Sequence, residues 1–207
     1  MPFEPEINYW KHKLRWVKPL NLFTDSARSD KKGNNKRSSG FVIDEKLKTQ
    51  LSRFSDDQKV SLFITLLSAY KVLLYRYSSQ DDICVGNVIT QDKQQADHLN
   101  ILPLRTEINS TNSFEELLQS VNSTVNEAYQ HQNLPCEKLT GLISEETDLN
   151  SNPLYQVMFV LQNGVAALAE HTLESDLTLF IKERRDEFAG RIEYNSNLYN
   201  ENTICRI

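Results

Sequence analysis

The chain has 207 residues, of which 39% are hydrophobic and 25% are charged, and its net charge is −5. This composition excludes a disordered or fibrous chain, and the length suffices for one ample core, so we expect a single domain over residues 1–207. The negative charge argues against nucleic acid or an anionic membrane as partner, because both attract proteins with a basic face.

The N-terminal sequence MPFEPEINYW lacks the charged and apolar regions of a signal peptide. No apolar run reaches membrane-spanning length, so we predict a cytoplasmic protein with no membrane partner. The three cysteines show no metal-ligand spacing and fit a reducing compartment. We therefore predict no metal site and no directly bound cofactor.

Hydrophobic periodicity predicts helices and strands in alternation along the chain. The predicted helices cover residues 7–17, 44–54, 60–77, 113–131, 136–143 and 201–207. The predicted strands cover residues 41–43, 83–85, 99–108, 155–161, 177–182 and 188–194. Such an order indicates an α/β fold, with a mixed β-sheet and flanking helices.

Local signals indicate where several of these elements begin. Asp44 suits a helix N-cap, and Ser113 with Glu116 three residues later forms a capping box. Pro135 suits the first turn of the short helix that follows it. Pro103 has no backbone N–H, which predicts an edge strand or a bulge at that position.

Two stretches stand out from this pattern. Tyr155–Leu161 is a nearly continuous apolar run, typical of a strand that is covered on both faces, and the turn residues at 150–153 set its start. Residues 19–39 lose all periodicity and carry most of the local positive charge, which predicts a mobile loop. A nucleic-acid-binding arm is the alternative, but no aromatic residues interleave its basic ones.

Five segments, in order, resemble the C-terminal lobe of the condensation domains of nonribosomal peptide synthetases. Asn100 and Arg105 match the motif F-V-N-T-x-x-x-R, HQNLPCEKL resembles H-Q-D-x-P-F-E-x-L, and DLNSNPLYQVMF matches D-x-S-x-x-P-L-F-Q-V-M-F. The other two are residues 60–86, which are very close to the family pattern, and Ser175–Leu179 with Ile192–Ser196. The resemblance implies a chloramphenicol-acetyltransferase-like half-domain.

The resemblance also implies where chemistry would occur. In the family, two such lobes enclose a tunnel for carrier-bound substrates, and a His-His-x-x-x-Asp-Gly motif in the other lobe supplies the base. This chain has four histidines, none of them adjacent to another, so the motif is absent from these residues. Two connections, 86–100 and 163–176, are also shorter than the family usually has, and we predict no catalytic residue.

Five residues are candidates for an interface or tunnel wall: Asn100, Arg105, His131, Asp148 and Asn163. For most of them a structural role is the alternative. Asn100 could make a structural hydrogen bond, Arg105 could form a salt bridge, and His131 could contact carbonyls at a helix end. Asp148 could brace the turn before the apolar strand.

We expect a truncated lobe that is non-catalytic alone and acts as a binding or assembly module, with a homodimer as the simplest state. The alternative is the acceptor-side half of a split enzyme. That enzyme would form amide bonds between phosphopantetheine-carried substrates, with a catalytic lobe and a carrier protein as partners. A small-molecule cleft derived from the old tunnel is a third possibility.

Overall fold

The computed structural model describes residues 3–27, 35–90, 99–144, 154–162 and 175–207. Its helices are α1 (Glu4–Lys13), α2 (Glu45–Asp57), α3 (Leu62–Ser78), α4 (Phe114–Gln130), α5 (Cys136–Ser144) and α6 (Glu201–Ile204). Its strands are β1 (Lys36–Ile43), β2 (Asp82–Thr90), β3 (Leu99–Glu107), β4 (Val157–Gln162), β5 (Leu177–Glu183) and β6 (Phe188–Asn195).

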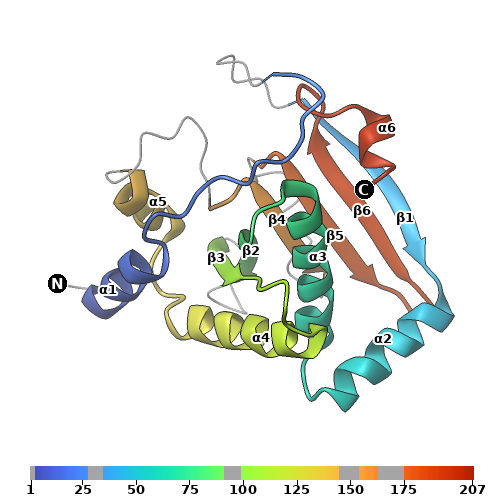
Figure 1. The fold of residues 1–207 in the computed structure, drawn as a ribbon, viewed down its shortest axis with the longest axis horizontal. Helices are drawn as coiled ribbons and strands as arrows, with labels where there is room; N and C mark the ends of the chain where they lie inside the picture. The colour runs from blue at the N-terminus through green and yellow to red at the C-terminus, as the bar shows by residue number, and fades with distance from the viewer. Residues whose placement is uncertain (1–2, 28–34, 91–98, 145–153, 163–174) are drawn as a thin grey trace.

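The strands form one six-stranded sheet in the order β1-β6-β5-β4-β2-β3. β4 runs parallel to both β2 and β5, whereas the other neighbours are antiparallel, so the sheet is mixed as predicted. Figure 1 shows α3 across the front of the sheet, with α1 and α5 together on the β3 side and β1 at the opposite margin. The α/β class predicted from the sequence is confirmed.

The core forms where α3 packs on β4. Residues 157–160 of β4 are at most 1% exposed, which confirms a strand that is covered on both faces. The ring of Phe159 lies 5.5 Å from that of Phe63 and 6.0 Å from that of Tyr70, both on α3. Most of α3 is covered in this central position and only Ala69, Arg76 and Tyr77 are exposed, which explains why its apolar residues extend over more than one stripe.

The local signals are confirmed. Asp44 caps α2 by accepting a hydrogen bond from Leu47 N, and Ser113 and Glu116 form the complete capping box of α4. Pro103 lies in β3, which is an edge strand. β5 and β6, both predicted as strands, pair antiparallel.

Several element boundaries differ from prediction. β2, predicted over 83–85, spans Asp82–Thr90, and the last helix, predicted over 201–207, ends at Ile204; the first helix and β1 differ as well. The first helix, predicted over 7–17, begins at Glu4 and ends at Lys13, and Trp16 then takes a positive φ of 56° that no helix continues through. β1 begins at Lys36, not at 41, so residues 36–39 belong to the sheet and not to the predicted loop. Their polar sequence shows no alternation, and only pairing with β6 makes them a strand.

The first part of the predicted loop is held by tertiary hydrogen bonds. The backbone N–H of Leu20 donates to Gln156 Oε1 over 2.8 Å, and Gln156 Nε2 donates back to Leu20 O over 3.0 Å. Asp25 accepts from Asn200 N and from Thr203 Oγ1 at 2.8 Å each. Residues 19–27 thus cross the molecule as an irregular strap.

Among the described helices, no single one is long and apolar enough to cross a bilayer. α2 and α3 reach the required length only as a pair, and the pair is bent by 106°.

Candidate functional site

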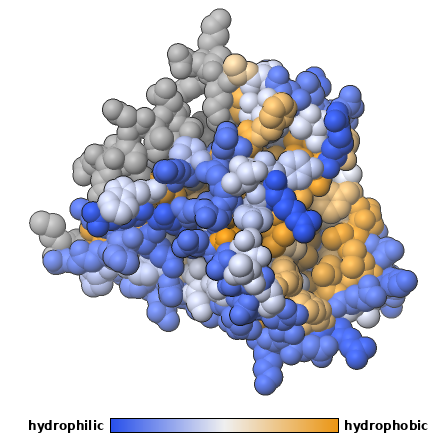
Figure 2. Space-filling model, viewed as in Figure 1, coloured by the Kyte–Doolittle hydropathy of each residue, from blue (hydrophilic) through white to orange (hydrophobic). Residues whose placement is uncertain are grey.

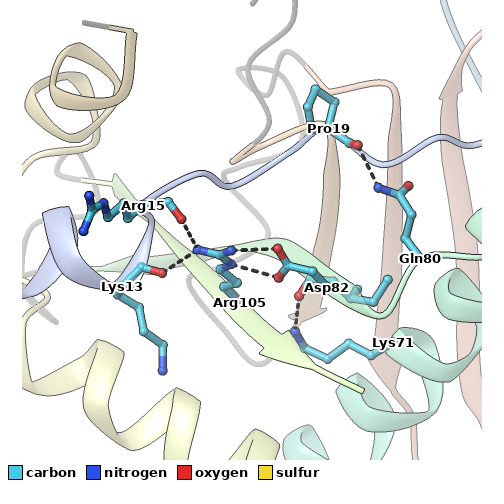
Figure 3. A network of polar contacts seen from close by, with 8 residues as sticks. Lys13, Arg15, Pro19, Lys71, Gln80, Asp82 and Arg105 are labelled. Atoms are coloured by element: carbon cyan, nitrogen blue, oxygen red, sulfur yellow. Dashed lines mark hydrogen bonds and ion pairs between the residues drawn. The ribbon is translucent and has the colours of Figure 1, made fainter. Parts of the chain in front are cut away.

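Arg105 on β3 connects the sheet to the N-terminal helix (Figure 3). Its Nε and Nη2 donate to the two carboxylate oxygens of Asp82 on β2, each over 2.8 Å. Its Nη1 donates to the carbonyls of Lys13 and Arg15 over 2.9 Å each. The salt bridge that sequence reasoning weighed against an anion clamp is therefore present, and it raises the pKa of the Arg105 guanidinium.

Asn100, also on β3, holds the connection between α4 and α5. Its Nδ2 donates to the carbonyls of Gln132 and Leu134 over 2.9 Å each, and its Oδ1 accepts from the N–H groups of Cys136 and Ile101. A side-chain amide offers two donor hydrogens and two acceptor lone pairs, so these four bonds use all of them. Asn100 is 3% exposed and acts as a structural clamp in this arrangement.

His131 lies at the C-cap of α4, where α1 packs against it. Its ring stacks on Tyr9 with 3.9 Å between centroids, and its carbonyl accepts from Trp10 Nε1 over 3.0 Å. Next to this stack, Glu127 accepts from Lys13 Nζ over 3.0 Å. Trp10 is 1% exposed and anchors α1 against the end of α4.

The three described candidates thus surround one feature, the contact of β3 with α1 and the α4–α5 connection. Arg105 and Tyr9 with His131 hold α1, and Asn100 holds the connection. Asp148 and Asn163 lie outside the described residues. A place on an interface or tunnel wall stays a prediction for all five.

A buried amine lies on the α3 side of the same two strands, where sequence reasoning missed it. Lys71 of α3 is 0% exposed, and its Nζ donates to the carbonyls of Ile83 on β2 and Leu104 on β3. Burial lowers the pKa of Lys71 to about 7. The apolar pattern of α3 gave no signal for it, because lysine is ordinarily assigned to a solvent face.

The described residues do not assemble a catalytic or metal-binding set. No group of three metal-ligating side chains occurs in this part of the chain. Cys84 is buried, and desolvation raises the pKa of its thiol to about 12, which opposes formation of a nucleophilic thiolate. The polar groups around β3 serve to brace elements against one another.

A separate apolar pocket lies between α3, the strap and the C-terminal residues. Its lining includes Leu22 and Phe23 of the strap, Tyr70 and Tyr77 of α3, and Ile207. Phe23 is 79% exposed at its rim. Sequence reasoning missed this pocket, although the apolar residues in PLNLF were a signal that the predicted loop contacts the core.

The fold is shared with solved proteins. The X-domain from teicoplanin biosynthesis matches with a TM-score of 0.87 and 22% identity over 99% of this chain and 52% of its own. The first condensation domain of the calcium-dependent antibiotic synthetase matches with a TM-score of 0.78 and 13% identity over 99% and 50%. These likenesses define the class as the chloramphenicol-acetyltransferase-like fold of condensation domains.

The condensation domain family model matches residues 2–207, and the chain belongs to that family. A linear gramicidin synthase of Brevibacillus parabrevis is 37% identical over 98% of this chain, which spans 4% of that protein. Phosphinothricin tripeptide synthetase PhsC of Streptomyces viridochromogenes is 32% identical over 97% of this chain and 20% of its own length. The chain thus spans about half of the solved domains and a small part of the synthetases that it matches.

Proposed function

We propose that these 207 residues form a binding and assembly module of nonribosomal peptide biosynthesis that does not catalyse condensation by itself. The observation that carries this proposal is the absence of adjacent histidines from the sequence. General-base assistance to an attacking amine needs an imidazole held against the nucleophile, which the family's paired histidines provide. The polar side chains at β3 give no substitute, because Asn100 and Arg105 are bound within the chain.

A binding role is supported by a related structure and by the surface. The X-domain from teicoplanin biosynthesis has been solved in complex with OxyB, so a protein of this fold binds another protein. Here Val42 and Leu47 are 61% and 45% exposed, and Figure 2 shows an apolar area on the right of the molecule, over the end of β1. Exposed apolar area of this kind marks partner sites, and a second copy of the chain is the simplest partner.

Two measurements test this proposal. The purified chain is mixed with donor and acceptor amino acids on phosphopantetheine-loaded carrier proteins, and the amide product is followed by mass spectrometry. We expect no product above the level without protein, and a dimer mass by light scattering. Turnover by the chain alone would contradict the non-catalytic assignment.

The second candidate is the acceptor-side half of a split condensation enzyme. It is favoured by the coverage of the solved domains, where nearly all of this chain matches only about half of each. Adding a separately expressed lobe that carries His-His-x-x-x-Asp-Gly to the same assay distinguishes the two candidates. Amide formation that requires both proteins would establish the split enzyme, with phosphopantetheine-carried substrates.

A cytoplasmic location is part of the proposal, because carrier-bound substrates are made there. Its test is fractionation of the source cells, followed by immunodetection of the chain.

A further inference from the structure

The two edges of the sheet differ in how they are protected. On β3, Pro103 has no N–H to offer, and the N–H of Ile101 donates to Asn100 Oδ1 over 3.0 Å. A proline and a capped amide are devices that stop an edge from accepting another strand. β3 therefore offers few backbone donors with which another strand could pair.

β1 contains no proline from Lys36 to Ile43. All eight residues from Lys36 to Ile43 pair with β6 in an unbroken antiparallel register that contains no proline and no bulge. In the same ladder, Ser196 N donates to Asn35 O over 2.8 Å, so Asn35 turns its backbone groups toward β6. Because these directions alternate along an antiparallel strand, the N–H and C=O groups of Ser38, Gly40 and Val42 point away from the sheet.

We propose that β1 is a strand-addition edge that pairs antiparallel with β1 of a second copy, so that one sheet runs through both molecules. The inference deepens the proposed self-association and rests on it. In the register that the outward groups allow, Gly40 faces Gly40 of the other copy and Ser38 faces Val42. Each facing pair then exchanges two backbone hydrogen bonds.

Charge selects this direction of pairing. β1 starts with Lys36 and Arg37 and runs directly into Asp44 and Glu45. An antiparallel partner places the basic start of one strand beside the acidic end of the other, whereas a parallel partner would juxtapose like charges. The register centred on Gly40 brings Lys36 opposite Asp44. Within the chain, Lys36 Nζ also pairs with Glu193 at 2.8 Å and Asp44 caps α2, so the contact across the two copies adds to bonds that both side chains already make.

Apolar side chains next to these backbone groups add to the pairing. Phe41 is 39% exposed and covers Gly190 of β6, where a Cβ would lie 2.2 Å from its ring. In the proposed register the two Phe41 rings are diagonal neighbours on one face, and Val42, 61% exposed, faces Ser38 on the other. Pairing would remove this exposed apolar surface from water.

The test is the solution mass of three full-length chains by light scattering and sedimentation: wild type, Gly40→Lys and Gly141→Lys. A Cβ at Gly40 meets only Gly190 O at 3.7 Å, so the monomer tolerates the change, but two lysines would face each other in the dimer. A Cβ at Gly141 meets nothing within 4 Å, which makes the same substitution there a matched control. We expect dimers for wild type and Gly141→Lys, and dimerisation weakened about fivefold in Gly40→Lys.

A second variant tests the backbone itself. Gly40→Pro removes an outward N–H that β6 does not use, so it should also favour the monomer, with circular dichroism confirming the fold. A wild-type dimer that persists in both Gly40 variants would overturn the β1 edge but leave self-association standing. A wild-type chain that stays monomeric at high micromolar concentration would overturn both.

Discussion

Arg105 on β3 and Asp82 on β2 form a bidentate ion pair, with both N–O distances at 2.8 Å. The pair orients the guanidinium so that Nη1 donates hydrogen bonds to two backbone carbonyls, those of Lys13, the last residue of α1, and Arg15. One side chain thus joins two strands and the N-terminal helix. The planar fork of arginine makes this possible, because it fixes several donors in one plane.

Arg105→Lys tests whether the Arg105 side chain holds β2, β3 and the N-terminal helix together. Lysine keeps the charge but cannot bind two carboxylate oxygens and two carbonyls together, so we expect a loss of about 2 kcal/mol in the free energy of unfolding. Urea denaturation gives the value, and Arg53→Lys is the matched control. Arg53 pairs with Asp57 at the exposed surface, with a separation of 3.8 Å, and its replacement should change stability by less than about 0.5 kcal/mol. An equal loss in the free energy of unfolding at the two positions would show that Arg105 does not stabilise the contact of β2 and β3 with the N-terminal helix.

Lys71 should make stability depend on pH. Burial lowers its pKa from 10.5 to about 7, so between these values the unfolded chain binds a proton that the folded chain does not. The free energy of unfolding should therefore rise with pH above about 7, with a slope approaching ~1.4 kcal/mol per pH unit. Urea unfolding between about pH 7 and pH 7.5 measures the slope where Cys84 is still largely protonated in the unfolded chain.

Lys71→Met is the control for that pH dependence. It keeps the length of the side chain and removes the titrating amine, so the slope assigned to Lys71 should disappear from the variant. An unchanged slope would assign the pH dependence to other groups.

Asn100→Ala should release the connection between α4 and α5. The carbonyls of Gln132 and Leu134 and the N–H of Cys136 each lose a partner, and we expect a cost of about 2–4 kcal/mol. Hydrogen exchange should show faster opening of α5 than of α4. Asn126→Ala, at an exposed position of α4, should leave stability unchanged or slightly raised, because alanine is the better helix former. A similar loss in both variants would argue against the clamp.

Gly86→Ala probes the packing of β2 on β4. A Cβ there would lie 2.3 Å from Met158 Sδ, and Met158 is fully buried, so we expect a cost of about 1–3 kcal/mol from overpacking. A double-mutant cycle with Met158→Ala should give a combined cost smaller than the sum by about 1 kcal/mol. Simple additivity would mean that the two side chains do not compete for space. Gly141→Ala, with open space around it, should be neutral or stabilising.

The class of fold and most of its elements follow from local signals in the sequence. The caps at Asp44 and Ser113, the all-round apolar helix α3 and the buried strand β4 are each set by neighbouring residues or by local periodicity, and the structure has them where they were expected. The family motifs contain Asn100 and Arg105, and both residues make structural hydrogen bonds within the chain, whereas their place on an interface or tunnel wall stays a prediction.

Features that join distant parts of the chain depend on tertiary contacts that local patterns do not contain. Residues 36–39 become a strand through β6, Lys71 is buried because β2 and β3 offer it carbonyls, and Arg105 reaches backbone groups about 90 positions away. The apolar pocket likewise needs the strap, α3 and the C-terminal residues together. The local hydrophobic pattern of a segment predicts whether it forms a helix or a strand. These contacts depend instead on which distant segments pair in the folded sheet.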